Sequence, residues 1–117
     1  MLVGYIRVST DDQNLNLQKD ALLKFGIDER NIFSDKTSGS KDKRVGLDKA
    51  IEFLKDGDTL VVWKLDRLGR SLAHLIDVIT NLKNRNVSFV SITEGMDTTT
   101  ASGELFFHIF GALAQFE

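Results

Sequence analysis

The sequence predicts an α/β fold, with a mainly parallel central sheet of four to five strands and helices on both faces. Apolar runs of strand length, rich in Val, Ile and Phe, alternate along the chain with segments whose apolar residues recur at helical spacing. The order of elements is β-α-β-α-β-α-β-α, which is typical of parallel sheets whose strands are connected by helices. The length of 117 residues is sufficient for one domain with one core.

Four segments are predicted to be strands, because they are short and apolar and contain many β-branched or aromatic residues. They are residues 2–8, 31–34, 59–64 and 87–93. Two helices are predicted between the first three strands, over residues 11–25 and 47–55. Each of them is followed by a glycine, Gly26 or Gly57, which is a common way for a helix to end.

A third helix is predicted to begin near Ser71, whose hydroxyl can cap it. Its apolar stripe consists of Leu72, Leu75, Ile76, Ile79 and Leu82. A fourth helix is predicted from near Ser102 to the last residue, and its apolar residues cover more than one stripe. We therefore expect this helix to have two partners, its own sheet and a second subunit.

The composition excludes several classes of protein. With 42% hydrophobic and 27% charged residues, the chain is neither disordered nor rich enough in apolar runs to span a bilayer. Cysteine is absent, so disulfides and thiolate metal sites are excluded, and no signal-peptide pattern opens the chain, so we expect a cytoplasmic protein. A net charge of -2 argues against nucleic-acid binding over the whole surface, so any such contact must be local or made by another part of the protein.

Two polar motifs follow predicted strands. Arg7 and Ser9 end the first strand, and Asp66, Arg67 and Arg70 follow the third. Because ligands of such folds bind beyond the carboxyl ends of the strands, parallel neighbouring strands would bring these five residues to one edge. Arg67 and Arg70 would also share a face if that turn is helical. A serine hydroxyl among guanidinium groups, which donate paired hydrogen bonds to phosphate oxygens, predicts attack on a phosphate through serine.

These motifs belong to a longer series, and on that series the chain resembles the N-terminal catalytic domain of a serine recombinase of the resolvase and DNA invertase family. The resemblance covers essentially all 117 residues. It is carried by residues 5–10, Gln13, Gln18, residues 35–39, Arg44, Gly46, Leu47 and residues 64–71. Five pieces in the same order and at the family's spacing are more specific than any one of them alone.

The resemblance implies a mechanism without cofactor, metal or ATP. Ser9 would attack the scissile phosphodiester of DNA and leave a 5′-phosphoseryl bond and a free 3′ hydroxyl. Four subunits would cut two sites, exchange strands by rotating half of the assembly and religate them, with DNA inversion or resolution as the outcome. The implied partners are the DNA recombination site, a second copy in a homodimer, a synaptic homotetramer and accessory DNA-bending proteins, with no membrane.

The resemblance also implies roles for the other site residues. Arg7, Arg44, Arg67 and Arg70 would clamp the phosphate, Asp66 would orient an arginine or handle a proton, and Gln13 and Gln18 would support Ser9 or its loop. Residues 1–117 would be the catalytic domain, with the long helix truncated and the helix-turn-helix DNA-binding domain absent. On that basis we expect the isolated chain to associate only weakly and to bind no specific DNA site.

The loop of residues 36–44 carries a further expectation. It lacks an apolar anchor and is rich in lysine, so without DNA we expect it to be mobile, with Arg44 away from Ser9.

Other interpretations of the same residues remain open. Ser9 would then only cap the helix that follows it, and Asp66 and Arg67 would form a structural ion pair. A phosphatase or nucleotide-binding α/β enzyme would use the cluster on a small phosphate, although no Gly-rich phosphate loop occurs in the sequence. A catalytically silent dimerisation module is the third alternative, and covalent trapping of Ser9 on DNA would distinguish it from a recombinase.

Overall fold

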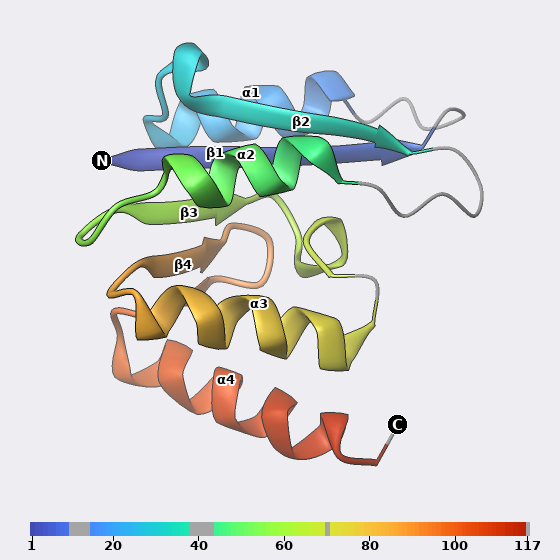
Figure 1. The fold of residues 1–117 in the computed structure, drawn as a ribbon, viewed down its shortest axis with the longest axis vertical. Helices are drawn as coiled ribbons and strands as arrows, with labels where there is room; N and C mark the ends of the chain where they lie inside the picture. Colours follow the sequence, from blue (N-terminus) through green and yellow to red (C-terminus); the bar gives the residue numbers. More distant parts are fainter. Residues whose placement is uncertain (10–14, 38–43, 70, 117) are drawn as a thin grey trace.

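The structure is a computed structural model that describes residues 1–9, 15–37, 44–69 and 71–116. Its centre is a five-stranded sheet with the order β2-β1-β3-β4-β5 (Figure 1). Strands β1 to β4 are parallel, and β5 runs antiparallel to β4. The predicted α/β class is therefore confirmed, and the fifth strand is a short antiparallel edge.

The elements follow one another in the predicted alternation. The strands are Leu2–Ser9 (β1), Ile32–Thr37 (β2), Thr59–Val62 (β3), Ser88–Ser91 (β4) and Met96–Asp97 (β5). The helices are Leu15–Phe25 (α1), Val45–Phe53 (α2), Leu72–Asn84 (α3) and Ala101–Ala114 (α4), with 3₁₀ turns at Glu29–Asn31 (η1) and Leu65–Arg67 (η2). The predicted strands 59–64 and 87–93 were too long, because the chain leaves the sheet after Val62 and Ser91.

Helices cover both faces of the sheet, as Figure 1 shows, with α1 on one side and α2 and α3 on the other. The side chains of β1 alternate accordingly. Val3 and Tyr5 belong to the core cluster that includes residues of α2 and α3, whereas Ile6 and Val8 pack in the smaller cluster with Leu22 of α1. Helix α4 lies outside these layers, against α3 and β5. No helix within the described ranges is both long and apolar enough to cross a membrane.

Two of the predicted helix ends are confirmed and one is wrong. Gly26, with φ +110°, follows α1, and the hydrogen bond from the Ile27 amide to the Leu22 carbonyl closes a Schellman motif. The Ser71 hydroxyl caps α3 by accepting from the His74 amide at 3.1 Å. Helix α2 ends at Phe53 and not at Gly57, because Leu54 adopts an extended backbone that buries its side chain in the core.

Asp58, just before β3, binds two backbone groups through its carboxylate, and these contacts make the stability of the fold depend on pH. Its carboxylate is buried and accepts from the Lys55 amide at 2.9 Å and from the α-ammonium of Met1 at 3.0 Å. Burial alone would raise the pKa of Asp58, but these two partners outweigh it, so the pKa lies below its ordinary value. Folding thus favours the charged form of Asp58. The stabilisation of the fold by this carboxylate is present above about pH 4 and is lost as pH falls through the pKa of Asp58 in the folded state.

We therefore expect Asp58→Asn to lower the free energy of unfolding by about 1–2 kcal/mol at neutral pH, because an amide oxygen replaces a charged acceptor. The difference from the parental chain should shrink when urea unfolding is repeated at progressively lower pH, as the parental aspartate becomes protonated too. An equal difference at neutral and at low pH would show that the charge of Asp58 contributes nothing.

Candidate active site

The carboxyl ends of β1 and β3 meet at one edge of the sheet because these strands are neighbours, with Tyr5 paired to Val62. Arg7 of β1 donates from Nη2 to the carbonyl oxygen of Asp66, in η2. In return, Arg67 donates from Nη1 to the carbonyl oxygen of Arg7 at 3.4 Å. The structure thus brings the two predicted motifs together at Arg7, Asp66 and Arg67.

Gln18 supports this edge from the other face. Its side chain lies on α1 and is fully buried, and Nε2 donates to the carbonyl oxygen of Arg7 at 3.1 Å. Two buried polar atoms here, Oε1 of Gln18 and Nε of Arg7, have no hydrogen-bond partner among the described residues. Since buried polar atoms are nearly always paired, these two atoms mark the end of β1 as a place where a polar ligand or a neighbouring segment would be stabilised.

Arg44 corrects one expectation. It immediately precedes α2, is only 8% exposed, and donates from Nη1 to the carbonyl oxygen of Leu68, just after η2. Arg44 itself is therefore held in place, because it adjoins the start of α2 and its side chain binds the Leu68 carbonyl. Its distance from the Ser9 side chain stays a prediction, because that side chain lies outside the described residues. Residues 38–43 lie outside the described residues, so the mobility of that part of the loop stays a prediction.

Asp35, near the end of β2, has a role that the sequence patterns did not predict. Its carboxylate accepts from the amides of Gly46 at 2.7 Å and Leu47 at 2.9 Å, and so caps α2. Arg44, which occupies the N-cap position, makes no side-chain capping bond. Sequence rules for helix caps consider only residues next to the helix start, whereas Asp35 lies eleven positions before Gly46. Asp35 is one of the motif residues that carry the resemblance, but the motif alone does not indicate a cap.

Tyr5 and Gly46 explain why this cap is tight. The Tyr5 hydroxyl donates to Asp35 at 2.7 Å, and burial, reinforced by the Asp35 carboxylate, raises the pKa of Tyr5 so that it stays a neutral donor. A Cβ atom at Gly46 would clash with the carbonyl oxygen of Ser34, so the helix can approach β2 this closely only with glycine there. The cap holds the start of α2, and Arg44 with it, beside the end of the sheet.

The turn η2 carries Arg67 on the edge of this cluster. The Asp66 carboxylate lies 3.5 Å from Nε of Arg67, but the Asp66 side chain is 68% exposed, so this ion pair contributes little to stability by itself. The Arg67 guanidinium also lies over the Trp63 ring, with 5.9 Å between its central carbon and the ring centroid. The turn η2 ends at Arg67, and Arg70 lies outside the described residues, so the shared face of Arg67 and Arg70 stays a prediction.

Three of the predicted site residues are described in part or not at all. Ser9 is the last residue of β1, two positions beyond Arg7, and pairs with Thr37 of β2. Its side chain, together with Gln13 and Arg70, lies outside the described residues. In the part of the chain that the structure does describe, no group of three or more His, Asp or Glu side chains is arranged to hold a metal ion.

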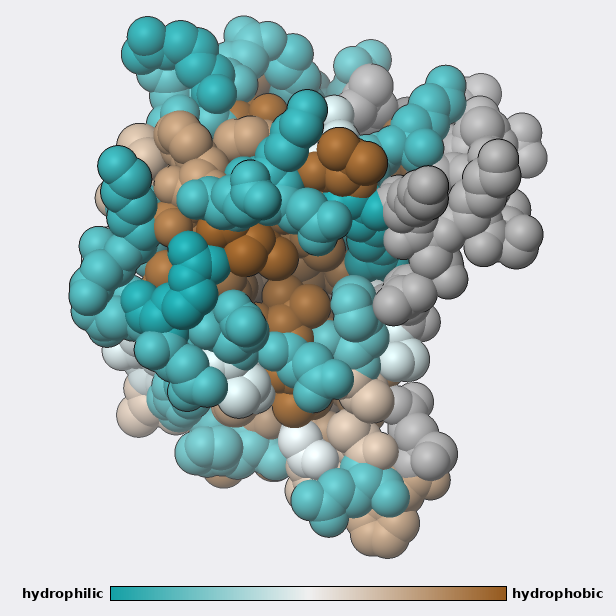
Figure 2. Space-filling view, viewed as in Figure 1, coloured by the Kyte–Doolittle hydropathy of each residue, from teal (hydrophilic) through white to brown (hydrophobic). Residues whose placement is uncertain are grey.

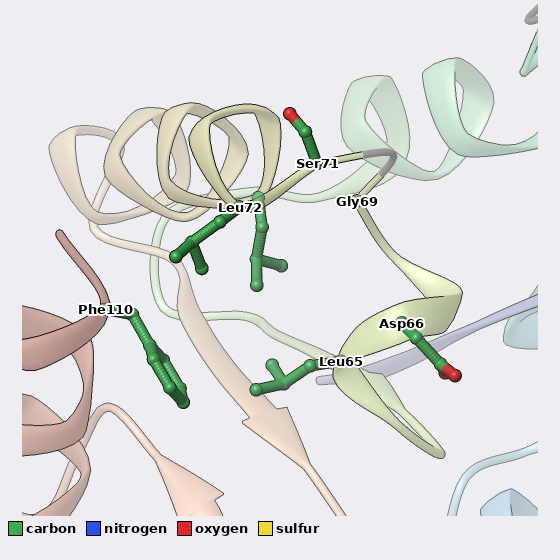
Figure 3. A pocket seen from close by; sticks show the side chains of 7 residues that line it. Leu65, Asp66, Gly69, Ser71, Leu72 and Phe110 are labelled. Carbon is green, nitrogen blue, oxygen red and sulfur yellow. The ribbon is translucent and has the colours of Figure 1, made fainter. Parts of the chain in front are cut away.

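A cavity of about 300 Å³ lies beside η2, between α3 and α4 (Figure 3). Leu65, Leu72 and Phe110 point toward it, whereas the carboxylate of Asp66 points away. Its walls are mostly apolar, so this cavity suits an apolar side chain and not a phosphate. Guanidinium groups, in contrast, suit a phosphate, so the arginine cluster and not this cavity is the candidate site.

The fold and the cluster together define an α/β protein with a candidate phosphate-binding site at the carboxyl edge of a parallel sheet. The family model described as the resolvase N-terminal domain matches residues 2–117, and the chain belongs to this family. This membership confirms the resemblance that the motifs indicated.

Several relatives are similar over the whole chain. The transposon Tn552 DNA-invertase BinR of Staphylococcus aureus is 56% identical, and the serine recombinase gin of Escherichia phage Mu is 52% identical, each over 100% of this chain. The chain spans 61% and 60% of the lengths of these two relatives. Among solved structures, the N-terminal catalytic domain of TP901-1 integrase is 30% identical with a TM-score of 0.82, and the comparison covers 98% of this chain and 94% of that one.

Proposed function

We propose that this chain is the catalytic domain of a site-specific DNA recombinase, with Ser9 as the nucleophile. The observation that carries the proposal is the gathering of three arginines from three elements around η2, at the end of the strand that carries Ser9. Arg7 comes from β1, Arg44 from the start of α2 and Arg67 from η2 itself. Membership of the resolvase family supports the same reading, because its relatives include a serine recombinase and DNA invertases.

The proposed reaction conserves the phosphodiester bond. The Ser9 oxygen loses its proton and forms a bond to phosphorus, while the bond from phosphorus to the 3′ oxygen breaks. The 3′ oxygen departs with its electron pair and takes up one proton to become a hydroxyl, so no net proton is gained or lost. The products are a 5′-phosphoseryl linkage and a free 3′ end, and attack by a 3′ hydroxyl of the exchanged strand reverses the step. One ester replaces another, so no external source of energy is required.

The arginines would supply the electrostatic part of catalysis. Each guanidinium has five N–H donors, so one that donates to a carbonyl can still donate to a phosphate oxygen. Arg7, Arg44, Arg67 and Arg70 would together stabilise the charge on the phosphoryl oxygens in the transition state. Asp66 would orient Arg67, from which it lies 3.5 Å away, and Gln13 and Gln18 would support the end of β1.

The exposed surface of α4 is consistent with an interface between subunits. Its exposed apolar side chains are Leu105, Phe106, Ile109 and Leu113. Figure 2 shows apolar surface over this part of the molecule and between α2 and α3. An apolar helix face outside the core needs a partner, and we propose a second copy of the chain, in a dimer and in a synaptic tetramer on DNA. The domain arrangement is part of the proposal: residues 1–117 act as the catalytic domain, with DNA binding supplied elsewhere.

A chimera tests the proposed function. This chain would replace the corresponding N-terminal part of the phage Mu recombinase, and the product would be incubated with a nicked suicide substrate that contains the DNA site of that recombinase. We expect a covalent complex that survives denaturation, holds the 5′ end of the cleaved strand and forms in EDTA. The intact phage Mu recombinase is the positive control. Release of inorganic phosphate from simple esters, with no covalent complex, would favour a phosphatase instead.

A further inference from the structure

We propose that Glu94 is a positioning residue for the arginine-bearing turn η2, an inference that rests on the proposed function. Glu94 lies in the turn between β4 and β5, far from Ser9 in the sequence. Both of its carboxylate oxygens lie 3.3 Å from the backbone nitrogen of Leu65, the first residue of η2. The Ser91 hydroxyl, on a fully buried residue, donates to the same carboxylate and so orients it.

The Leu65 amide needs such a partner. The first N–H groups of a helical turn have no acceptor within the turn, and the residue at the N-cap position, Lys64, makes no side-chain capping bond. Glu94 provides the missing acceptor from a different loop, and a charged acceptor makes a stronger hydrogen bond than a neutral one. The contact thus fixes the first residue of η2, Leu65, whereas Arg44 holds the chain just after the turn, at the Leu68 carbonyl.

Glu94 differs from the other groups that hold this turn. Arg7 binds the Asp66 carbonyl and Arg44 binds the Leu68 carbonyl, but both arginines are proposed to engage the phosphate as well. Even if they keep their carbonyl bonds, each guanidinium must then serve η2 and the phosphate together, so neither holds η2 independently of the substrate. The Glu94 contact does not involve a clamp residue, so it can hold η2 in position throughout the reaction.

The chain has a built-in reporter for this turn. Trp63 is the only tryptophan of the sequence, it precedes η2 by two residues, and its ring lies 4.8 Å from Nζ of Lys64 and 5.9 Å from the central carbon of the Arg67 guanidinium. A displacement of η2 would therefore change the fluorescence of Trp63. Amide exchange at Leu65 reports the hydrogen bond itself.

The experiment compares Glu94→Ala and Glu94→Gln with the parental chimera, and uses Glu52→Gln, an exposed glutamate of α2, as the matched charge control. In Glu94→Ala we expect Leu65 amide exchange to accelerate by roughly tenfold and Trp63 emission to shift, with the thermal midpoint nearly unchanged. The rate of covalent complex formation at saturating DNA should fall by about 10- to 100-fold, with unchanged DNA affinity, because a small misplacement of Arg67 is costly. Glu94→Gln should recover most of the rate, since its amide oxygen can still accept from Leu65.

Two results would overturn the proposal. One is a rate of covalent complex formation by Glu94→Ala that equals the parental rate at saturating DNA. The other is a loss of rate in Glu52→Gln as large as the loss in Glu94→Ala. If the parental chimera forms no covalent complex while the intact phage Mu recombinase does, the proposed function fails, and Leu65 exchange still decides whether Glu94 holds η2. Unchanged exchange in Glu94→Ala would then refute the positioning role, and faster exchange would uphold it.

Discussion

Replacing Ser9 with alanine is expected to abolish covalent cleavage of DNA. The oxygen proposed as the nucleophile is lost, and the arginines cannot replace it because guanidinium groups are donors only. Loss of a catalytic nucleophile typically lowers the rate by roughly 10⁴-fold or more, so the chimera with Ser9→Ala should form no detectable covalent complex with the suicide substrate in a denaturing gel.

The same substitution should leave the fold intact. Ser9 ends a strand, and loss of a small hydroxyl there, even one that caps a helix, should change the free energy of unfolding by about 0.5–1 kcal/mol, as measured by urea unfolding. DNA affinity in a gel-shift assay should also be unchanged. Cleavage by Ser9→Ala near the parental rate, with stability lowered by about 1 kcal/mol, would remove Ser9 as the nucleophile and support the alternative in which it only caps a helix.

Replacing Asp35 with alanine should have the largest effect on stability. The substitution removes the acceptor for the Tyr5 hydroxyl and for the amides of Gly46 and Leu47, and leaves a buried hydroxyl and a helix start without their partner. We expect the free energy of unfolding to fall by about 2–4 kcal/mol. Cleavage should fall as well, even at a temperature where the variant is fully folded, because the start of α2 no longer holds Arg44 in place.

Two milder variants separate these effects. Asp35→Asn keeps an oxygen that can accept from α2 and should recover much of the stability, whereas Tyr5→Phe removes only the hydroxyl donor and should cost about 1 kcal/mol. Urea unfolding and the cleavage assay of the chimera would be run on all three variants. If Asp35→Ala were as stable as the parental chain, the cap would not support α2 in the way that the contacts indicate.

The fold was predictable because its signals are local. Apolar runs separated by helical segments indicate a parallel sheet, and such a sheet places the ends of β1 and β3 at one edge. The convergence of Arg7 with Asp66 and Arg67 follows from that topology alone. The caps at Gly26 and Ser71 were also predictable, because the residues that make them lie within a few positions of the helix ends.

The supports of the site were not predictable, because they join segments that are distant in sequence. Asp35 caps a helix from β2, and Glu94 reaches η2 from the turn after β4. The burial of Arg44 depends on both the start of α2 and the carbonyl of Leu68, and the lysine-rich composition of the preceding loop does not indicate it. Sequence patterns identify the residues that do chemistry more readily than the contacts that hold them.

The most direct test of the account is to map the atom that becomes attached to DNA. The covalent complex of the chimera with a suicide substrate would be digested with a protease and a nuclease, and the peptide that carries the residual nucleotide would be sequenced by tandem mass spectrometry. The account predicts a phosphodiester linkage between the Ser9 oxygen and the 5′ phosphate of the cleaved strand. Attachment at any other residue, or a cleaved strand with no peptide attached, would contradict it.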